Sequence, residues 1–398
     1  MPFIESPQLE TPNQRFAALE GIRALCALAI VVFHARTFTG PPWGTGGGEG
    51  DAGPWLAHLN VGVSVFFVLS GFLLFRPFVQ AHLTDQGPPG FRAYLARRMI
   101  RIYPAYWLAL ILSTMILGLD LGNWWATVRI YTLTHIYWGD TALGGLVQSW
   151  SLATEVSFYL FLPLWAHLVR RIGAQRANRI EIHTASLIVL YLSGVGVRWW
   201  LRDGGHSIGY ATLAANTDLF ALGMGLALIE VVSRTRGFTP RPVQWLFSER
   251  PLVAAVLGFA CYWALVAIGY PEGFNEPTVF QELARQILFG IIGMAVVGAG
   301  VFGLTSQTNT GRLLRSWPLW ALGTISYGIY LWHLTLLEKL APIEWLVGSP
   351  SLLALVSWAA LGSIIAASAS WVALERPLIG WLRQRSARGG SSSIHKRE

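Results

Sequence analysis

The residues of this sequence that are most able to do chemistry are ionisable side chains inside long apolar stretches. A charged group in the hydrocarbon region of a membrane costs at least about 2.5–3.5 kcal/mol at a helix centre, so each is a candidate functional residue. The interior candidates are Glu20, Arg23, His34, Glu155, Asp218, His333 and Glu375. Arg36, His58, Arg198 and Glu230 fall near the ends of apolar stretches, where side chains can reach the water interface.

Two of these residues, Arg23 and His34, share the first apolar stretch. Their spacing corresponds to about 16.5 Å of rise and about three helical turns, so both project from roughly one face. Glu155 enters on the fourth stretch at a depth that allows it to meet His34. A histidine beside a carboxylate is a general-base arrangement, because the carboxylate fixes the tautomer and stabilises the imidazolium. His34 and Glu155 are therefore candidate catalytic residues. The alternative is a structural pair in which two buried polar groups satisfy each other.

The run Arg97-Arg98-Met99-Ile100-Arg101 at the start of the third apolar stretch is a second candidate site. Guanidinium groups suit bidentate binding of phosphate, although basic residues also anchor helices on the cytoplasmic side. The sequence contains no His-Glu-x-x-His, Gly-x-Ser-x-Gly or Cys-x-x-Cys motif. We therefore expect no metal site and no serine nucleophile.

The composition places these residues in a membrane. Hydrophobic residues make up 53% of the 398 and charged residues only 13%, against about 25% charged in a soluble domain. A membrane span needs about 20 apolar residues. Candidate spans are 17–38, 58–80, 99–119, 147–169, 184–201, 211–232, 251–270, 284–304, 319–340 and 352–374. We predict an all-α polytopic membrane helical bundle with about ten transmembrane helices.

The stretch 124–138 is apolar but short, and it contains Arg129 and His135. If it dips into the membrane and returns, all the arginine-rich loops fall on one side, and the loops near 120–123, 271–283 and 341–351 contain no Lys or Arg. Positively charged loops face the cytoplasm, so we predict a re-entrant segment and two cytoplasmic termini. Non-helical backbone at membrane depth must be buried or line a wet cavity, so we expect 124–138 to border a cavity.

The predicted organisation is a cytoplasmic N-terminal segment (1–16), one membrane domain (17–380) and a disordered basic cytoplasmic tail (381–398). The net charge of +8 comes almost wholly from arginines in short links between spans, so we expect membrane lipids and no nucleic acid as partners. Arginine-rich usage with lysine only at Lys339 and Lys396 is typical of a high-GC bacterium. We therefore expect a multi-pass protein of the bacterial plasma (inner) membrane.

Seven short motifs follow one another along these spans. They are LEGIR at 19–23 followed by His34, FFVLSGF at 66–72, RRMIRIYP at 97–104, SWSLATE at 149–155, DLFALG at 218–223, SYGIYLWH at 326–333 and ERP at 375–377. Each motif alone is weakly specific. With all seven in order, the chain resembles the acyltransferase-3 family of membrane acyltransferases over about residues 15–380.

The resemblance implies transfer of an acyl group, usually acetyl, from acyl-coenzyme A to a hydroxyl of a sugar, glycolipid or glycosylated metabolite. Acyl-coenzyme A would be the donor substrate, and no tightly bound cofactor is implied. His34 is implied as the base and Arg23, Arg97, Arg98 and Arg101 as donor-binding positions, while Trp150, Ser151, Asp218 and His333 are predicted to contact substrate. Glu20 stands where the family commonly has Asp, a small change in reach. Some members append a soluble esterase-like domain that this sequence does not show, so we expect acceptor handling in the membrane domain.

Other functions use the same residues. Direct transfer and a covalent acyl-histidine intermediate both fit the sequence. A transporter or flippase for a glycolipid would use the buried charges as a binding site, although no inverted repeat is detectable. A catalytically silent scaffold is disfavoured, because keeping His34 and Glu155 inside a membrane costs free energy and a scaffold has no use for them. Binding of acyl-coenzyme A separates the enzyme from both of these rivals.

Overall fold

The structure, a computed structural model, describes residues 16–39, 53–173, 178–205, 207–271, 276–304, 308–343 and 351–391, which are helical with no β-strand. The long helices are α1 (Ala17–Arg36), α3 (Val61–Leu83), α4 (Phe91–Leu117), α6 (Trp150–Gly173), α7 (Arg179–Asp203), α8 (Thr217–Arg236), α10 (Pro251–Ala267), α11 (Val279–Gly298), α14 (Ser326–Leu340), α16 (Leu352–Ser370) and α17 (Arg376–Ser391). Shorter helices are α2 (Gly53–Leu56), α5 (Trp124–Tyr131), α9 (Arg241–Val243), α12 (Asn309–Leu314) and α13 (Trp317–Thr324). The predicted all-α class is confirmed.

Eight helices within these ranges are long and apolar enough to cross a membrane, or nine if the bent pair Arg241–Glu249 and Pro251–Ala267 is one span. The chain is therefore a multi-pass membrane protein. The count falls short of about ten because the predicted span 319–340 is broken at Ile325 into α13 and α14. These two helices have 8 and 15 residues, so neither is long enough to cross alone.

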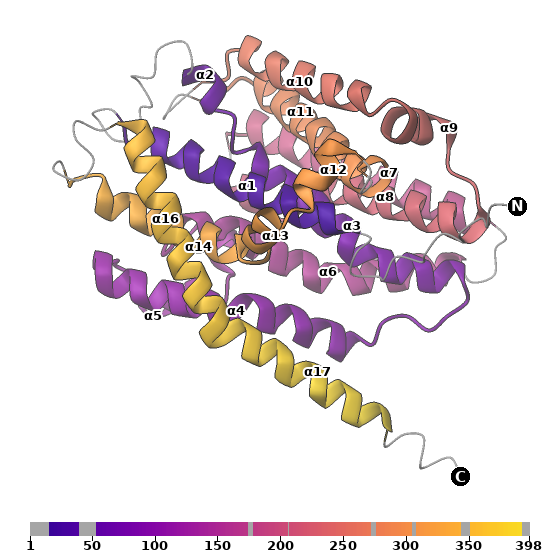
Figure 1. Cartoon of the computed structure of the whole chain (residues 1–398), viewed down its shortest axis with the longest axis horizontal. Helices are drawn as coiled ribbons and strands as arrows, with labels where there is room; N and C mark the ends of the chain where they lie inside the picture. Colours follow the sequence, from indigo (N-terminus) through magenta and orange to yellow (C-terminus); the bar gives the residue numbers. More distant parts are fainter. Residues whose placement is uncertain are drawn as a thin grey trace, which may run out of the picture.

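The helices lie side by side, with α1 and α3 in the middle of the bundle and α16 and α17 crossing its surface (Figure 1). The helices α1 and α3 run antiparallel, because the rings of Phe16 and Phe72 are 5.4 Å apart while Gly62 packs on the carbonyl of Cys26. We call one end of the bundle the arginine end. It holds the start of α1, the end of α3 and the start of α4, together with the last turns of α6 and α8, which carry arginines.

The opposite end of the bundle also carries arginines, and several of them have acidic partners. Arg129 pairs with Asp140 at 3.0 Å, and Arg202 pairs with Glu276 at 2.8 Å.

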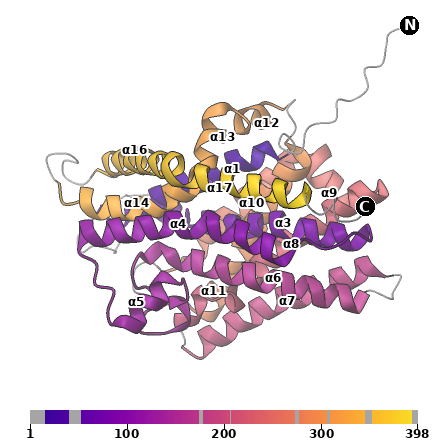
Figure 2. The same cartoon turned by 90° about the horizontal axis from the view of Figure 1, so that it is seen from below.

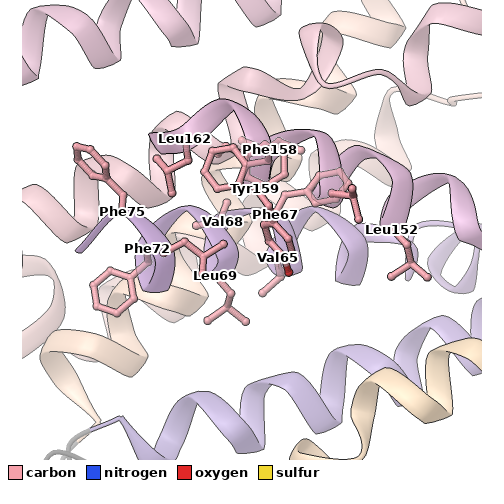
Figure 3. Close-up of a cluster of buried hydrophobic side chains, with 14 of the residues drawn as sticks. Val65, Phe67, Val68, Leu69, Phe72, Phe75, Leu152, Phe158, Tyr159 and Leu162 are labelled. Atoms are coloured by element: carbon pink, nitrogen blue, oxygen red, sulfur yellow. The ribbon is translucent and has the colours of Figure 1, made fainter. Parts of the chain in front are cut away.

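Close packing of α3 against α6 and α8 forms the centre of the core. A Cβ atom at Gly71 would collide with the Phe220 carbonyl, and one at Gly223 would collide with the Val68 carbonyl, so the backbones of α3 and α8 touch. Phe220 stacks on Phe158 of α6 at 4.0 Å between ring centroids. Figure 3 shows the apolar side chains that α3 and α6 contribute to this cluster. The contact fixes the depth of α6 relative to α3.

The short helix α5 forms the predicted re-entrant segment. Three side chains of α4 donate hydrogen bonds to backbone carbonyls at the end of α5. Tyr106 donates to Ile130 at 2.8 Å and Trp107 to Tyr131 at 3.0 Å. Tyr103 donates to Thr132, just after the helix, at 2.9 Å. Tyr106 lies about 16 Å inside the end of α4, so the segment reaches well into the bundle. Its eight residues cannot cross a membrane, and Figure 2 shows α5 beside α4 at one end of the bundle.

The tail differs from the prediction. The chain was expected to lose regular structure from residue 381, but α17 continues to Ser391. Residues 392–398 and the predicted N-terminal segment, apart from Phe16, lie outside the described residues.

Candidate active site

A vestibule of about 1030 Å³ opens at the arginine end between α1, α4, α13 and α17. A narrow channel of about 100 Å³ continues from it along α3, from Leu74 to Val63. The vestibule and the channel share Arg23, Arg98, Arg101 and Tyr327 in their walls, so they are adjacent. The stretch of α3 that lines the channel is about 16 Å long. The channel therefore leads from the arginine end toward the opposite end of the bundle.

The walls of the vestibule and channel carry a surplus of positive charge. They contain five arginines, namely Arg23, Arg97, Arg98, Arg101 and Arg376, and three carboxylates, namely Glu20, Glu155 and Glu375, which leaves a formal charge of +2. Arg23 pairs with Glu20 at 3.3 Å. The Nε atom of Arg98 is buried and has no hydrogen-bond partner in the described part of the chain. A buried guanidinium with a free N–H is suited to bind an anion that enters the vestibule.

Glu155 lies in the channel with these arginines rather than beside His34. Its carboxylate accepts a hydrogen bond of 2.5 Å from the Ser70 hydroxyl of α3. Arg23, Arg98 and Arg101 line the same channel. Glu155 therefore supplies the negative charge of a site that is otherwise basic.

His34 forms a pair with His333, and neither histidine is among the residues that line the vestibule or the channel. His34 Nδ1 lies 3.1 Å from His333 Nε2 and 3.1 Å from the Ile30 carbonyl, while His333 Nδ1 lies 2.7 Å from the Tyr330 carbonyl. A carbonyl can only accept, so His333 Nδ1 carries a proton and the neutral ring accepts at Nε2. His34 Nδ1 must then donate, and the lone pair of His34 Nε2 stays free, with no partner among the described residues.

The predicted contact between His34 and Glu155 is therefore wrong. The hydroxyl of Tyr330 bonds Ser151 at 2.7 Å, which sets the level of α14 against α6. Glu155 lies one turn from Ser151 toward the arginine end, and His333 lies one turn from Tyr330 in the other direction. These two displacements place the carboxylate and the histidine pair about 10 Å apart along the bundle.

A third pocket, of about 700 Å³, lies at the opposite end and shares Val63 and Phe67 with the channel. Of the predicted substrate contacts, Trp150 lines this pocket and Ser151 lines the channel. Asp218 is buried behind the pocket wall, where it accepts from Gln286 Nε2 at 3.1 and 2.9 Å. The residues 139–144 that follow the re-entrant segment line the pocket, whereas residues 124–138 do not.

Several residues around the site were not predicted as site residues, because the sequence search began from charged groups inside apolar stretches. Ser70, Tyr330 and Gln286 are neutral, and nothing in their composition separates them from structural polar residues. Two of them lie inside the family-like motifs, at 66–72 and 326–333, which was the only signal. Gln286 lies in no motif and becomes visible only through its contact with Asp218.

Comparison with known proteins agrees with this architecture. The family model described as an acyltransferase domain matches residues 16–375. A Bacillus subtilis (strain 168) protein named "Putative peptidoglycan O-acetyltransferase YrhL" is 27% identical over 365 residues, which cover 86% of this chain and 51% of that protein. O-acetyltransferase OatA of Staphylococcus aureus (strain NCTC 8325 / PS 47) is 23% identical over 338 residues, covering 79% of this chain and 49% of that protein.

The chain thus spans about half the length of the curated relatives it matches. No solved structure matches it. The range matched by the family model contains every long helix from α1 to α16. It also contains the lining of the vestibule, the channel and the pocket, except for the α17 residues at the vestibule edge. The chain belongs to the acyltransferase-3 family, as its seven motifs predicted.

Proposed function

We propose that this protein transfers an acetyl group from acetyl-coenzyme A to a hydroxyl of a cell-envelope sugar polymer. The observation that carries the proposal is the series of adjacent vestibule, channel and pocket, with positive charge at one end and Tyr330, whose carbonyl accepts from His333, in the channel wall. Family membership supports acyl transfer, and the names of the relatives support acetyl and a peptidoglycan-like acceptor.

In this proposal the phosphates of the donor bind Arg98 and Arg101 in the vestibule, with Arg23 deeper. Arg97 lines only the vestibule, so it contributes to attraction of the anion rather than to the channel. The extended pantetheine arm runs along α3 through the narrow channel. This route carries the thioester from the arginine end toward Tyr330, which is next to the histidine pair.

His34 acts as the general base. Its free Nε2 lone pair takes the proton of the acceptor hydroxyl while the hydroxyl oxygen attacks the thioester carbonyl. The carbon–sulfur bond then breaks, and the coenzyme A thiolate takes the proton back from the His34 imidazolium. The products are an acetyl ester and free coenzyme A. Base catalysis of this kind contributes about 10²–10⁴-fold, and the channel supplies positioning of the thioester.

The test of this proposal is transfer by purified protein. With [acetyl-¹⁴C]acetyl-coenzyme A and soluble muropeptides released from peptidoglycan by a muramidase, we expect alkali-labile label on the sugar and release of free coenzyme A. A transporter or flippase would bind or move the sugar without consuming the donor. If folded protein binds the muropeptides but consumes no more donor than a protein-free control, the transporter or flippase is favoured.

The role assigned to His333 is to position His34. Replacing His333 with Ala removes one of the two acceptors of the His34 Nδ1 proton and leaves only the Ile30 carbonyl to orient the ring, so we expect turnover to fall about 10- to 100-fold with donor affinity unchanged. His333→Gln keeps a hydrogen-bond acceptor and should restore part of the turnover. His167→Ala, at an exposed histidine of α6, is the matched control. Equal turnover in the Ala and Gln variants would contradict the positioning role.

We further propose that the arginine end is cytoplasmic and that both chain termini lie on that side. Single cysteines at Phe238, which follows α8, and at Gly204, which follows α7, should label from opposite sides of the membrane. Cys26 and Cys261 are buried and should add little background. An impermeant maleimide added to intact cells should reach the cysteine at 204 and not the one at 238. The reverse result would invert the proposed direction of acyl transfer.

A further inference from the structure

The pocket at the opposite end has features of a ligand site that the mechanism above does not use. Its volume of about 700 Å³ lies within the usual range of about 300–1,000 Å³ for small-molecule pockets. It lies between the ends of α3, α6 and α11 and shares Phe67 and Val63 with the channel. A ligand held there would be next to the end of the route proposed for the thioester.

The back wall of this pocket is a fixed network of ion pairs. Arg198 and Glu282 are both buried, with 2.6 Å between Nη1 and Oε1, and Arg198 also donates to the Ala215 carbonyl and Asn216. Glu282 further accepts from Arg285 and from the Tyr270 hydroxyl. Burial raises the pKa of Tyr270, which keeps that hydroxyl protonated as a donor. Two guanidinium groups thus share one carboxylate, and the Nε of Arg285 is left without a partner in the described residues.

Gln286 presents an oxygen of fixed orientation beside this network. The Asp218 carboxylate lies within 3.1 Å of Gln286 Nε2 through both of its oxygens. The amide nitrogen of Gln286 faces Asp218, so its amide oxygen faces away from the carboxylate. Gln286 lines the pocket, and no described residue donates to its Oε1. Asp218 therefore sets which atom of Gln286 a ligand meets.

Asn60 adds a second unpaired oxygen to the same pocket. Its Oδ1 is buried and has no hydrogen-bond partner among the described residues, although it sits at the start of α3 where the side chain could cap the helix. A buried polar atom without a partner is unfavourable, so a rotation of the Asn60 side chain that brings Oδ1 to a ligand donor in the pocket would be favoured. Trp150 and Phe289 supply aromatic surface between these polar groups.

We propose that this pocket binds the acceptor sugar, with Gln286 and Asn60 receiving its hydroxyl groups and Asp218 acting as the positioning residue for Gln286. Two amide oxygens that need donors, a guanidinium N–H that needs an acceptor, and aromatic faces together fit a saccharide with several hydroxyls and a carbonyl-bearing substituent. A bare hydrocarbon chain would leave these polar groups unpaired. The inference rests on the proposed function, because it assigns the acceptor of that same reaction to a site.

The experiment compares chromosomal variants in the organism that carries the protein, where the natural acceptor is present. The readout is ester-linked acetate on envelope saccharides, measured by mass spectrometry against a deletion strain. Gln286→Met keeps the size of the side chain and removes its oxygen, so we expect ester-linked acetate to fall about 10- to 100-fold. Acetyl-coenzyme A binding by the purified variant should stay within twofold of wild type, because Gln286 lies outside the vestibule and channel.

Two further variants separate positioning from folding. Asp218→Leu frees the Gln286 amide and should resemble Gln286→Met, whereas Asp218→Asn keeps one acceptor oxygen and should restore part of the acetate. Gln384→Met, at an exposed glutamine of α17, is the matched control and should equal wild type. Membrane yield of each variant is measured in parallel, and acetate is expressed per folded protein.

The outcomes distinguish this inference from the proposed function. Wild-type acetate in Gln286→Met, per folded protein, would overturn the acceptor site while leaving acetyl transfer intact. Loss of acetyl-coenzyme A binding together with acetate would also overturn it, because the variant would then act through the donor. If wild type and the deletion strain carry equal ester-linked acetate, the proposed function fails and this site assignment fails with it.

Discussion

His34→Ala should lower turnover about 10²–10⁴-fold while leaving acetyl-coenzyme A affinity within about twofold of wild type. The reason is that His34 Nε2 has a free lone pair, whereas the donor-binding arginines lie at the far end of the channel. The measurement is coenzyme A release and donor binding on the same detergent-purified protein, with muropeptides as acceptor. Removing the base should change the rate of the chemical step and little else.

The control for this variant is the exposed His167 of α6, where the same substitution should leave turnover unchanged. A double variant with His333→Ala should be no slower than His34→Ala alone, because His333 acts only through His34. Folded His34→Ala protein that binds the donor and turns over at a near-normal rate would exclude His34 as the base. An additive double variant would instead give His333 an independent role.

The sequence predicted which residues share a cavity better than it predicted which residues touch. Arg23 and Glu155 were selected because charge inside an apolar stretch is expensive, and Arg98 and Arg101 because guanidinium groups suit phosphate; all four line one channel. The pairing of His34 with Glu155 was wrong because depth was counted along each helix separately. The relative shift of α6 and α14 depends on the Ser151–Tyr330 contact, which pairs residues far apart in sequence.

The same limit explains the count of helices and the missed acceptor pocket. By hydropathy, residues 319–340 form one apolar stretch. The helix breaks at Ile325, and this break does not appear in the composition of the stretch. Gln286 carries no charge, so a search for charged residues in spans does not select it. Only its contact with Asp218 in the structure indicates a role. The re-entrant segment was predictable because it rests on a sum over many loop charges rather than on any one contact.

Arg98→Ala and Arg101→Ala should each weaken acetyl-coenzyme A binding by about 1.5–3 kcal/mol, or about 10- to 150-fold, through loss of a charge-assisted hydrogen bond. Both side chains line the vestibule and the channel, and Arg98 Nε is a buried donor without a partner in the described chain. Donor affinity of the wild type should also fall as salt is added, because part of the attraction is electrostatic. Isothermal titration of purified protein measures both effects. Arg92→Ala, at an exposed arginine of the same helix, is the matched control.

Glu155→Gln should act in the opposite direction on the same measurement. The variant keeps an oxygen that accepts from Ser70 but removes the negative charge that lies among Arg23, Arg98 and Arg101. Donor binding should therefore become about two- to fivefold tighter, the size expected for a partly screened charge pair. Weaker binding in Glu155→Gln would mean that the carboxylate organises the arginines instead of opposing the donor. If neither Arg98→Ala nor Arg101→Ala changes donor affinity, these arginines only anchor the helix at the cytoplasmic face, and the donor does not bind in the vestibule.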